Sequence, residues 1–420
     1  MGRQDPKPLA GQPESRLVCD LTQSWSDVGG GVGTYLKRKR AYILDKTPHR
    51  HLMILPGPRD EVIDEGRAVT VLIASPKVPA SPHYRLLLRN RAVRAALEKY
   101  RPNLIECQDA YNLPWAAIAH RKRHPATALV AGYFTDFPTV YVKRPLAKFI
   151  GRRMADALSR QGYNYCGALY SRFDAVYGLS ENGGVAKLTE AGVDDVAVVP
   201  LGVELEDFDP SRRDMELRRS LGVAEDKPLL IYAGRLDGEK RPDIVVDAFR
   251  QLPAAMGATL VLLGDGPQRA QFSELGKSIR LIAPGFVNGR AELARWLASA
   301  DIYVSAMADE TFGISVIEAQ ASGLPVVGVA AGAMVDRVTP AMGRLGPVGD
   351  AAAMARNIVD VWSHRPREMG LAAREHVRHR FAWEQSMECL FGTVYRQAFA
   401  RRAASAELQP AGMALSLADA

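Results

Sequence analysis

The chain has 420 residues, of which 47% are hydrophobic and 24% charged, and its formal net charge is +7. This composition is that of an ordinary globular protein, long enough for two domains. No apolar run reaches the roughly 20 residues of a membrane-spanning helix, and the polar N-terminal segment lacks the apolar core of a secretion signal. We therefore expect a cytoplasmic protein.

Cysteine and charge placement narrow the expected partners. The four cysteines form no C-x-x-C pair, which predicts free thiols in a reducing compartment and argues against a zinc site. Residues 1–200 hold 29 Lys and Arg against 19 Asp and Glu, whereas residues 201–420 hold 25 against 28. Basic runs at 37–40, 121–123 and 152–153 suit an anionic membrane surface, or are solvated helix faces. Because no aromatic residues interleave them, we expect no nucleic-acid partner.

In the first half of the chain, short β-rich runs alternate with helical stretches. Helical patterns occupy 84–100 and 147–170. This alternation predicts a parallel, doubly wound sheet. The expected strands are 16–22, 51–56, 69–75, 103–109, 126–133, 174–180 and 196–200.

The pattern restarts after an acidic, loop-like segment that begins near residue 201. We therefore predict an α/β fold of two Rossmann-like domains that face each other across a ligand cleft. The further strands are expected at 228–234, 258–264, 279–285, 301–307 and 325–329. The expected divisions are a first domain at 1–203, a second at 204–380, a helix at 381–402 that can cross back to the first domain, and a loose tail at 403–420.

Two cations follow the first strand of the second domain. Arg235 comes directly after this strand, and Lys240 follows five residues later, before a helix expected at 242–251. A planar guanidinium fork and a mobile ammonium beside a helix start suit a diphosphate. Solvated basic residues at a helix start give the same pattern, so this motif is not specific by itself.

The segment DETFGISVIEAQASGLPVVG, after strand 301–307, is more informative. On one helix, Glu310 and Glu318 would lie about 12 Å apart along the axis, a poor match to the carboxylates of a glycoside hydrolase at about 5–9.5 Å. We therefore place Glu310 in a loop and Glu318 in a helix that starts near Gly313. Backbone N–H groups from Gly313 to Ser315 can then face a phosphate, and the carboxylates can accept hydroxyls of a sugar and a ribose.

Together these motifs resemble the donor site of retaining glycosyltransferase family 4, which has the GT-B fold. The resemblance rests on Arg235 with Lys240, on Glu310-x7-Glu318, and on the EA-x-A-x-G-x-PVV continuation. It covers most of the chain. Segment 198–210 resembles the interdomain connection, 262–267 and 283–287 the nucleotide-contacting loops, 343–350 a loop after the later donor-domain helices, and 27–38 the glycine-rich loop that opens the first helix.

The resemblance implies a role for each matching residue. Arg235 and Lys240 would neutralise the departing diphosphate, and Glu310 would bind the transferred sugar. Glu318 would hold the ribose. The implied donor-binding residues are Gly30, Gly31, Gly264, Phe286, Val287, Phe312, Gly313, Ile314, Ser315 and Glu318, with Phe286 and Val287 at the base and Gly30 and Gly31 closing over the phosphates.

The implied reaction is transfer of a hexose, with retention, from a UDP-glucose or GDP-mannose type donor to a lipid or glycan acceptor. It needs neither a covalent glutamate nor a metal, so no cofactor is expected. A basic first domain fits peripheral attachment at the inner membrane face. Asp207 and Asp209 have the D-x-D pattern of metal-dependent transferases, but they fall in the interdomain connection and are interpreted as structural.

One segment departs from the family pattern. Family members often have a His before Thr-Asp-Phe, where this chain has Phe134 in GYFTDFP. Asp136 is the catalytic candidate on this wall, with Thr135 as an alternative; Asp136 is otherwise a turn residue before Pro138. A sugar that lacks the group gripped by the His, or altered activity, would also account for Phe134.

Three other functions compete with transfer. A GT-B nucleotide-sugar epimerase would share fold and donor but needs an acid/base set that the first domain does not show. A dehydrogenase would place G-x-G-x-x-G directly after its first strand, whereas GGGVGT begins nine residues after Asp20. A non-catalytic protein that binds a nucleotide or a membrane is the third, because of Phe134.

Overall fold

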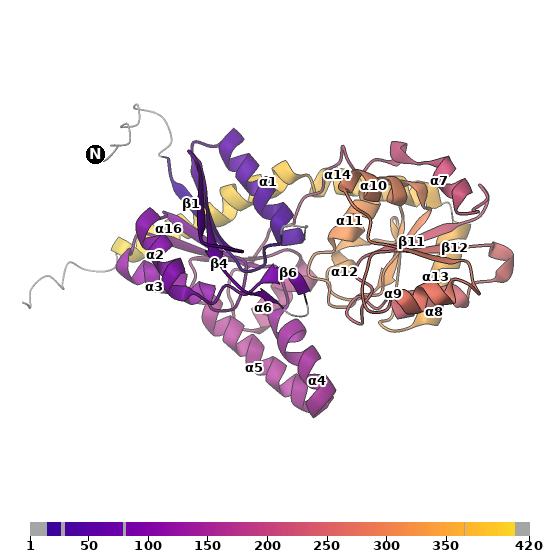
Figure 1. Cartoon of the computed structure of the whole chain (residues 1–420), viewed down its shortest axis with the longest axis horizontal. Coiled ribbons are helices and arrows are strands. Elements are labelled where there is room, and N and C mark those ends of the chain that lie inside the picture. Colours follow the sequence, from indigo (N-terminus) through magenta and orange to yellow (C-terminus); the bar gives the residue numbers. More distant parts are fainter. Residues whose placement is uncertain (1–14, 27–29, 79–80, 365, 408–420) are drawn as a thin grey trace, which may run out of the picture. The chain divides into compact units, whose positions relative to one another are not determined.

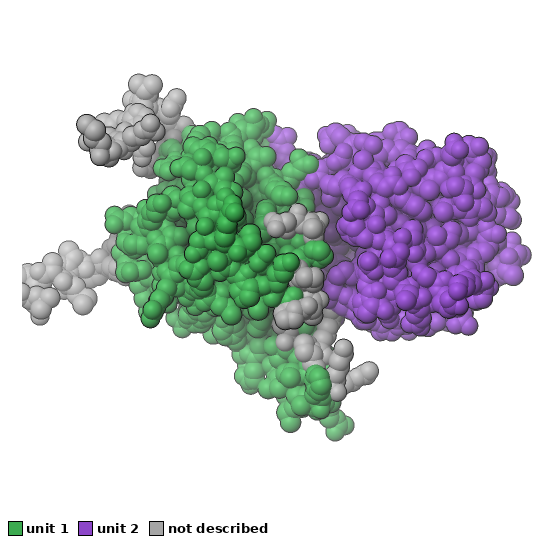
Figure 2. Space-filling view, viewed as in Figure 1, with its two compact units in different colours: residues 1–178, 187–199, 387–420 green, residues 179–186, 200–386 purple. Residues whose placement is uncertain are grey.

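The computed structural model describes residues 15–26, 30–78, 81–364 and 366–407. The chain forms two compact units, coloured separately in Figure 2. The chain passes from unit 1 to unit 2 after Val199, against an expected boundary at residue 203, and it returns to unit 1 at Met387. Unit 1 comprises residues 1–178, 187–199 and 387–420, and unit 2 comprises residues 179–186 and 200–386.

Unit 1 contains an eight-stranded sheet in the order β10-β9-β8-β7-β1-β2-β4-β3 (Figure 1). All neighbours are parallel except β3, which runs antiparallel to β4 at the edge. Sequence analysis did not predict β3 or the separate β5–β6 hairpin. The strands are β1 (Leu17–Leu21), β2 (Arg50–Gly57), β3 (Glu61–Glu65), β4 (Ala68–Ala74), β5 (Lys77–Val78), β6 (Ser81–Arg85), β7 (Leu104–Cys107), β8 (Ala128–Tyr133), β9 (Ala175–Gly178) and β10 (Ala197–Val198).

The helices of unit 1 differ from the expected ones at two places. The stretch expected to be helical from residue 84 begins with strand β6, and its helix starts only at Asn90. The stretch 147–170 is broken at Gly151, whose φ of 80° ends one helix before the next begins. The helices are α1 (Gly31–Lys46), α2 (Asn90–Tyr100), α3 (Leu113–Arg123), η1 (Pro138–Lys143), α4 (Arg144–Ile150), α5 (Arg152–Tyr170) and α6 (Ala186–Glu190).

Unit 2 contains a six-stranded parallel sheet in the order β13-β12-β11-β14-β15-β16. Numbered within the unit this is 3-2-1-4-5-6, the order of dinucleotide-binding folds, with its switch point between β11 and β14. Strands such as LLIYA and TLVLL are buried throughout because helices cover both faces. The strands are β11 (Leu229–Ala233), β12 (Thr259–Leu263), β13 (Leu281–Gly285), β14 (Ile302–Val304), β15 (Val326–Val329) and β16 (Gly343–Gly346).

The helices of unit 2 return the chain between these strands. Several begin at clear sequence signals: Pro242 is at the first turn of α8, and the Asp350 side chain caps α13 by accepting the Ala353 N–H at 2.8 Å. The elements are η2 (Glu181–Val185), η3 (Pro210–Arg212), α7 (Met215–Ser220), α8 (Pro242–Arg250), η4 (Ala254–Met256), α9 (Arg269–Leu275), α10 (Arg290–Ser299), α11 (Ile314–Ala321), α12 (Met334–Arg337), α13 (Ala351–Ser363), α14 (Pro366–Arg380) and α15 (Trp383–Cys389). Segment 343–350, expected as a loop, begins with strand β16.

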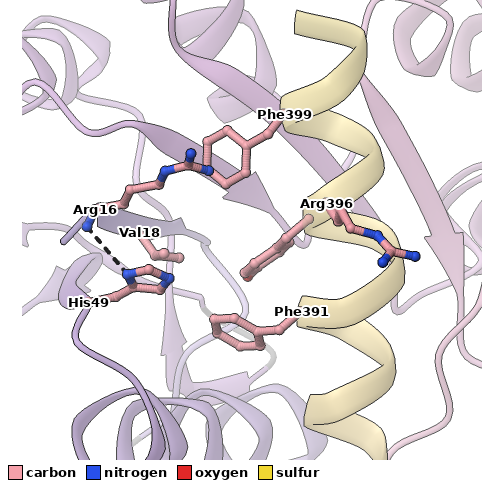
Figure 3. A pocket seen from close by; sticks show the side chains of 7 residues that line it. Arg16, Val18, His49, Phe391, Arg396 and Phe399 are labelled. Carbon is pink, nitrogen blue, oxygen red and sulfur yellow. Dashed lines mark hydrogen bonds between the residues drawn. The ribbon is translucent and has the colours of Figure 1, made fainter. Parts of the chain in front are cut away.

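The C-terminal segment continues from α15 through η5 (Leu390–Tyr395) into α16 (Arg396–Glu407). The expectation of a loose tail from residue 403 is therefore corrected for 403–407, which are helical; residues 408–420 lie outside the described residues. The last helix packs on unit 1 beside a hollow of about 310 Å³, where the Arg16 guanidinium lies 4.0 Å from the Phe399 ring centre (Figure 3).

A buried polar cluster ties this C-terminal segment to the sheet of unit 1. The Lys39 ammonium, on α1, lies 2.5 Å from Asp20 on β1 and 3.0 Å from Glu106 on β7, and all three side chains are fully buried. Tyr395 donates to Glu106 at 2.6 Å. Tyr35 and Tyr177 each donate to the other Glu106 oxygen at 2.8 Å. Part of the basic run 37–40 is therefore internal, not surface, charge.

None of the described helices combines the length and apolarity that a membrane span requires. The four cysteines are free, as the sequence predicted, and three of them are buried.

Candidate functional site

The switch point of unit 2 brings the predicted charged residues to one edge of the sheet. Strands β11 and β14 are hydrogen-bonded neighbours, so their carboxyl ends lie side by side. Arg235 follows β11, and the loop that carries Glu310 follows β14. In open α/β sheets this position is where ligands bind.

One charge pair at this edge joins the two loops. The Lys240 ammonium lies 3.0 Å from a Glu310 carboxylate oxygen, and the side chains keep 24% and 15% of their surface exposed. A pair that is close and still reachable from solvent can exchange partners with a ligand. Lys240 can turn to a phosphate while Glu310 turns to sugar hydroxyls.

Asp237 shapes the loop that presents both cations. One of its carboxylate oxygens accepts the backbone N–H groups of Glu239, at 3.0 Å, and of Lys240, at 3.1 Å. The Arg235 guanidinium pairs with Asp237 and Glu239, and 59% of its side chain is exposed. The structure thus places Arg235 and Lys240 on one turn, linked through Asp237.

Gly313 starts the helix that follows the Glu310 loop. Its φ of 82° is in the left-handed region, and its carbonyl accepts the N–H of Val316 at 3.0 Å and of Ile317 at 3.1 Å. The N–H groups of Gly313, Ile314 and Ser315 precede these first helical bonds, as those of any helix start do. The sequence predicted that an anion binds at this helix start, and that role stays a prediction.

Two further residues hold the Glu310 loop, and sequence reasoning missed both. The Arg337 side chain is buried, and it donates to the carbonyl of Phe312 at 3.0 Å and of Leu179 at 3.1 Å. Ser180 donates to the Thr311 carbonyl at 2.7 Å. Burial lowers the pKa of Arg337 to about 10, so it stays a cation at neutral pH. Leu179 lies 158 positions from Arg337, and Ser180 lies 131 positions from Thr311, so no local pattern reveals these two contacts.

Tyr303 connects the two sides of the switch point. Its hydroxyl lies 2.9 Å from the Ser315 hydroxyl and 3.2 Å from the carbonyl oxygen of Ala233, to which it donates. The start of α11 is therefore fixed to the end of β11, next to the turn that holds Arg235. Such support keeps the charged groups at set distances.

The other predicted donor loops lie along the same sheet edge. A Cβ on Gly264, whose φ is 137°, would meet the Gly234 carbonyl oxygen at 1.9 Å, so only glycine lets these two strand ends approach each other. Beyond β13, Phe286 is 64% exposed and Val287 is half-buried. An exposed aromatic ring at this place is available for stacking on a base.

Glu318 is buried on α11 and paired with Arg290. The Arg290 guanidinium donates to Glu318 at 3.1 Å. It also pairs with Glu204 of residues 198–210, which we call the connecting segment. Burial raises the pKa of Glu318 to about 7, with Arg290 lowering it and Glu204 raising it. This link was not predicted, because the three residues are far apart in sequence.

The two residues of unit 1 that are predicted to bind the donor, Gly30 and Gly31, lie at the start of α1. Gly30 precedes α1 with a φ of 128°, and Gly31 begins the helix with open space around its Cα. Asp27, Val28 and Gly29 of the same predicted loop lie outside the described residues. The role of Gly30 and Gly31 toward donor phosphates stays a prediction.

Asp136, the catalytic candidate of unit 1, is fully buried and has several partners. Lys187 lies 2.5 Å from one oxygen, and Tyr133 and Tyr163 donate to the other at 2.9 and 2.8 Å. Burial alone would raise the pKa of Asp136, but Lys187 and these hydrogen bonds hold it below its usual range. Its part in transfer stays a prediction.

Phe134 is also an internal residue. Its side chain is 7% exposed, and its ring centre lies 4.9 Å from that of Tyr35 and 6.1 Å from that of Tyr177. The residue that departs from the family pattern therefore packs over the buried cluster of unit 1.

The acidic residues with metal-like patterns have other partners. Asp209 caps η3 by accepting the Ser211 N–H at 2.8 Å, and it pairs with Arg374, which agrees with a structural role for this D-x-D segment. Within the described ranges, one set of His and carboxylate side chains has metal-like spacing: Glu98, His120 and His124 in unit 1. Arg101 and Arg123 lie 3.7 and 3.8 Å from Glu98 there.

Family models match both halves of the chain. The family described as Glycosyl transferases group 1 matches residues 214–376, and Glycosyltransferase Family 4 matches residues 29–207. A GDP-mannose-dependent alpha-mannosyltransferase of Mycobacterium tuberculosis is 30% identical over 357 residues, covering 83% of this chain and 88% of the relative.

Two further comparisons cover nearly the whole chain. The GDP-mannose-dependent alpha-(1-6)-phosphatidylinositol dimannoside mannosyltransferase of M. tuberculosis is 26% identical over 395 residues, covering 92% of this chain and 97% of the relative. The solved sucrose-phosphate synthase of Thermosynechococcus elongatus has a TM-score of 0.71 at 22% identity, covering 92% of this chain and all of its own.

Two parallel α/β units of this topology, with cations and carboxylates at one switch point, define a GT-B transferase that uses a nucleotide-sugar donor. The chain belongs to glycosyltransferase family 4. It is a hexosyltransferase, and the predicted fold class and family are confirmed.

Proposed function

We propose that the chain transfers a mannosyl group, with retention, from GDP-mannose to a lipid or glycan acceptor. The observation that carries the proposal is the Lys240–Glu310 pair, at 3.0 Å, where β11 and β14 end side by side. Lys240 and Arg235 neutralise the departing diphosphate, and Glu310 accepts hydroxyls of the transferred sugar. GDP-mannose is favoured over UDP-glucose because two of the relatives reported above are named GDP-mannose-dependent mannosyltransferases.

Retention in this mechanism requires no covalent glutamate. The departing diphosphate, held by cations and by the N–H groups that start α11, stays on the face that the acceptor attacks. Glu318 is paired with Arg290, and Glu310 is paired with Lys240. Both carboxylates thus have a cationic partner, and the mechanism assigns neither of them as the nucleophile. We also propose that no metal ion takes part, since Lys240 and Arg235 supply the positive charge that a metal supplies elsewhere.

The donor is tested by a thermal-shift screen of GDP, UDP, ADP and their hexose derivatives, followed by turnover with an acceptor panel that includes phosphatidylinositol mannosides. We expect GDP and GDP-mannose to stabilise the protein most, transfer to persist in EDTA, and the product to keep the α configuration by NMR. Binding without transfer to any acceptor, or epimerisation of the donor, would refute the proposal.

We also propose that unit 1 attaches to the surface of an anionic membrane, where a lipid acceptor is presented. Figure 1 shows α4 and α5 as a pair that extends away from the sheet of unit 1. Near their junction Phe149 is 85% exposed, and Ile150 and Met154 are 43% and 56% exposed. Residues 137–155 include five Lys or Arg and no Asp or Glu. Apolar side chains amid positive charge suit insertion into an anionic interface.

Sedimentation with phosphatidylcholine vesicles, with and without 30 mol% phosphatidylglycerol, tests this attachment. We expect binding only to the anionic vesicles, weakening from 50 to 500 mM NaCl, and loss of most binding in the Phe149→Ser/Ile150→Ser double variant. Leu371→Ser, at a 62% exposed leucine of unit 2, is the matched control and should bind normally. Salt-independent binding, or equal loss in the control, would contradict the proposal.

A further inference from the structure

The contact between Arg290 and Glu318 joins three segments of unit 2. Arg290 is the first residue of α10, directly after the loop that carries Phe286 and Val287. Its guanidinium donates to Glu318 on α11 at 3.1 Å, pairs with Glu204 of the connecting segment, and lies 4.8 Å from the centre of the Phe208 ring. One side chain therefore links the loop that carries Phe286 and Val287, the Glu318 carboxylate and the connecting segment.

The chemistry of ribose binding explains why such a cation is needed. A cis-diol is held best by an ionised carboxylate, which can accept both hydroxyls at once. The side chain of Glu318 is only 7% exposed, and burial of this kind favours the neutral acid, which is a poorer acceptor. A cation in direct contact opposes this effect by favouring the ionised form, and it fixes the direction of the carboxylate.

We propose that Arg290 is a positioning residue for donor binding, which keeps Glu318 ionised and directed at the ribose hydroxyls, while Glu204 holds Arg290 in place. This inference rests on the proposed function, because it takes Glu318 as the ribose ligand. It adds a residue outside the motif that carries the family resemblance, on a different helix from Glu318.

The charges around Glu318 make the proposal sensitive to pH in a defined direction. The charged groups that act on it are Arg290 from α10 and Glu204 from the connecting segment. Glu318 in turn adds to the rise that burial gives the pKa of Tyr303 on β14. Arg290 lowers the pKa of Glu318 from the value that burial would set, and Glu204 raises it. Arg290→Gln should therefore move ribose-dependent binding to higher pH, and Glu204→Gln should move it to lower pH.

The decisive measurement compares GDP with 2′,3′-dideoxy-GDP by calorimetry at pH 6, 7.5 and 9. In the unmodified enzyme at pH 7.5 we expect GDP to bind roughly 30- to 100-fold more tightly than 2′,3′-dideoxy-GDP, because the dideoxy analogue leaves a buried carboxylate without hydroxyl partners. In Arg290→Gln this preference should fall to about 3-fold at pH 7.5 and recover in part at pH 9. UDP and its dideoxy analogue, measured in parallel, make the result independent of the base.

The same variants separate a positioning role from a structural one. Arg290→Lys keeps the charge and should keep most of the preference for the ribose hydroxyls, even if Arg290→Gln folds poorly. Arg295→Gln, on the same helix and paired with Glu292 and Asp214, is the matched control and should behave like the unmodified enzyme. In turnover, Arg290→Gln should raise the donor KM with a smaller change in kcat.

Two outcomes overturn different statements. If Glu318→Gln keeps the full preference for GDP over the dideoxy analogue, Glu318 does not bind the ribose, and the assigned donor site fails with it. If Glu318→Gln removes the preference but Arg290→Gln keeps it at every pH, the donor site stands and only the role of Arg290 is refuted. Shifts in the same direction for Arg290→Gln and Glu204→Gln also refute that role.

Discussion

At the switch point of unit 1 the acidic side chains are sealed inside, whereas at that of unit 2 they remain reachable. Beside β1 and β7, Asp109 is buried and accepts hydrogen bonds from Thr22 at 2.6 Å and from the Gln23 N–H at 2.5 Å. Beside β11 and β14, Glu310 has one cation at 3.0 Å and part of its surface in solvent. Two sheets with closely related strand orders thus differ in how far the acidic side chain at this position is enclosed.

The difference lies in how many partners each carboxylate already has. Glu106 of unit 1 contacts Lys39 and receives three tyrosine hydroxyls, so a ligand would have to displace a complete set of partners. Satisfied buried networks of this kind define one structure, and they do not exchange partners easily. Glu310 keeps acceptor capacity for a ligand. We therefore expect charge at a switch point to mark a ligand site only where its hydrogen bonding is incomplete.

Removing the cation of the buried cluster should have the largest effect. Lys39→Met leaves Asp20 and Glu106 without their shared counter-ion, which we expect to cost about 3–5 kcal/mol in the free energy of unfolding. Urea denaturation followed by circular dichroism measures the loss. Lys37→Met, two residues earlier and exposed, is the control, with a change within about 0.5 kcal/mol. Equal stability of the two variants would contradict the sealed character of this cluster.

Removing the charges of the unit 2 pair should have the opposite profile. Lys240→Ala and Glu310→Gln should each lower kcat about 10²- to 10³-fold, because they remove stabilisation of the leaving diphosphate and of the sugar. Thermal stability should stay nearly unchanged, since the pair is partly exposed. Lys277→Ala, which removes an exposed ion pair with Glu274, is the activity control. A folded Glu310→Gln with full activity would overturn the site.

Asp136 offers a sharper comparison, because it was predicted as catalytic yet is fully buried. If its contacts with Lys187 and Tyr163 are its main role, Asp136→Asn should destabilise the protein by about 1–3 kcal/mol. Activity of the folded fraction should then fall less than 10-fold. Unfolding and turnover measured on one preparation distinguish the roles: lost turnover without lost stability would show a direct part in transfer.

Glu318 should show a smaller effect of opposite sign on stability. Its pKa is raised to about 7 in the folded protein, against an ordinary value of 4.5. The folded state therefore favours the protonated acid: this contribution is complete below pH 4.5 and is lost as pH rises through 7. Glu318→Gln should stabilise the protein by about 1–3 kcal/mol at pH 8 and by little at pH 5. Urea unfolding at both pH values tests this, and equal differences at both would contradict it.

Much of the fold could be predicted because its central strands are apolar throughout. Runs such as LLIYA and TLVLL need no partner to be recognised. The edge strand β3 was missed because EVIDE is acidic and almost entirely exposed, and β16 was missed because two of the four residues in GRLG are glycine. Edge strands such as β3 owe their form to pairing with a neighbour more than to their own composition.

The candidate site divides along a similar line. Lys240, Glu310 and Gly313 were predicted because they lie in local motifs after strands. Arg337 was not, since its partners Leu179 and Phe312 are brought to it only by the fold. Lys39 was placed in a basic surface run because the sequence does not show that Asp20 and Glu106 flank it. Single charges within apolar strands, such as Asp20 in LVCDL, are a signal for such buried partners.

The contact between Tyr395 and Glu106 has a consequence for the order of folding during synthesis. Unit 2 ends at Ser386, so all its residues have been made before the chain returns to unit 1. The hydrogen bonding of Lys39 and Glu106 in unit 1 is therefore complete only after Tyr395 has emerged from the ribosome. The unit that begins first is therefore the last to close, and an unfinished chain exposes its charged interior to chaperones and proteases.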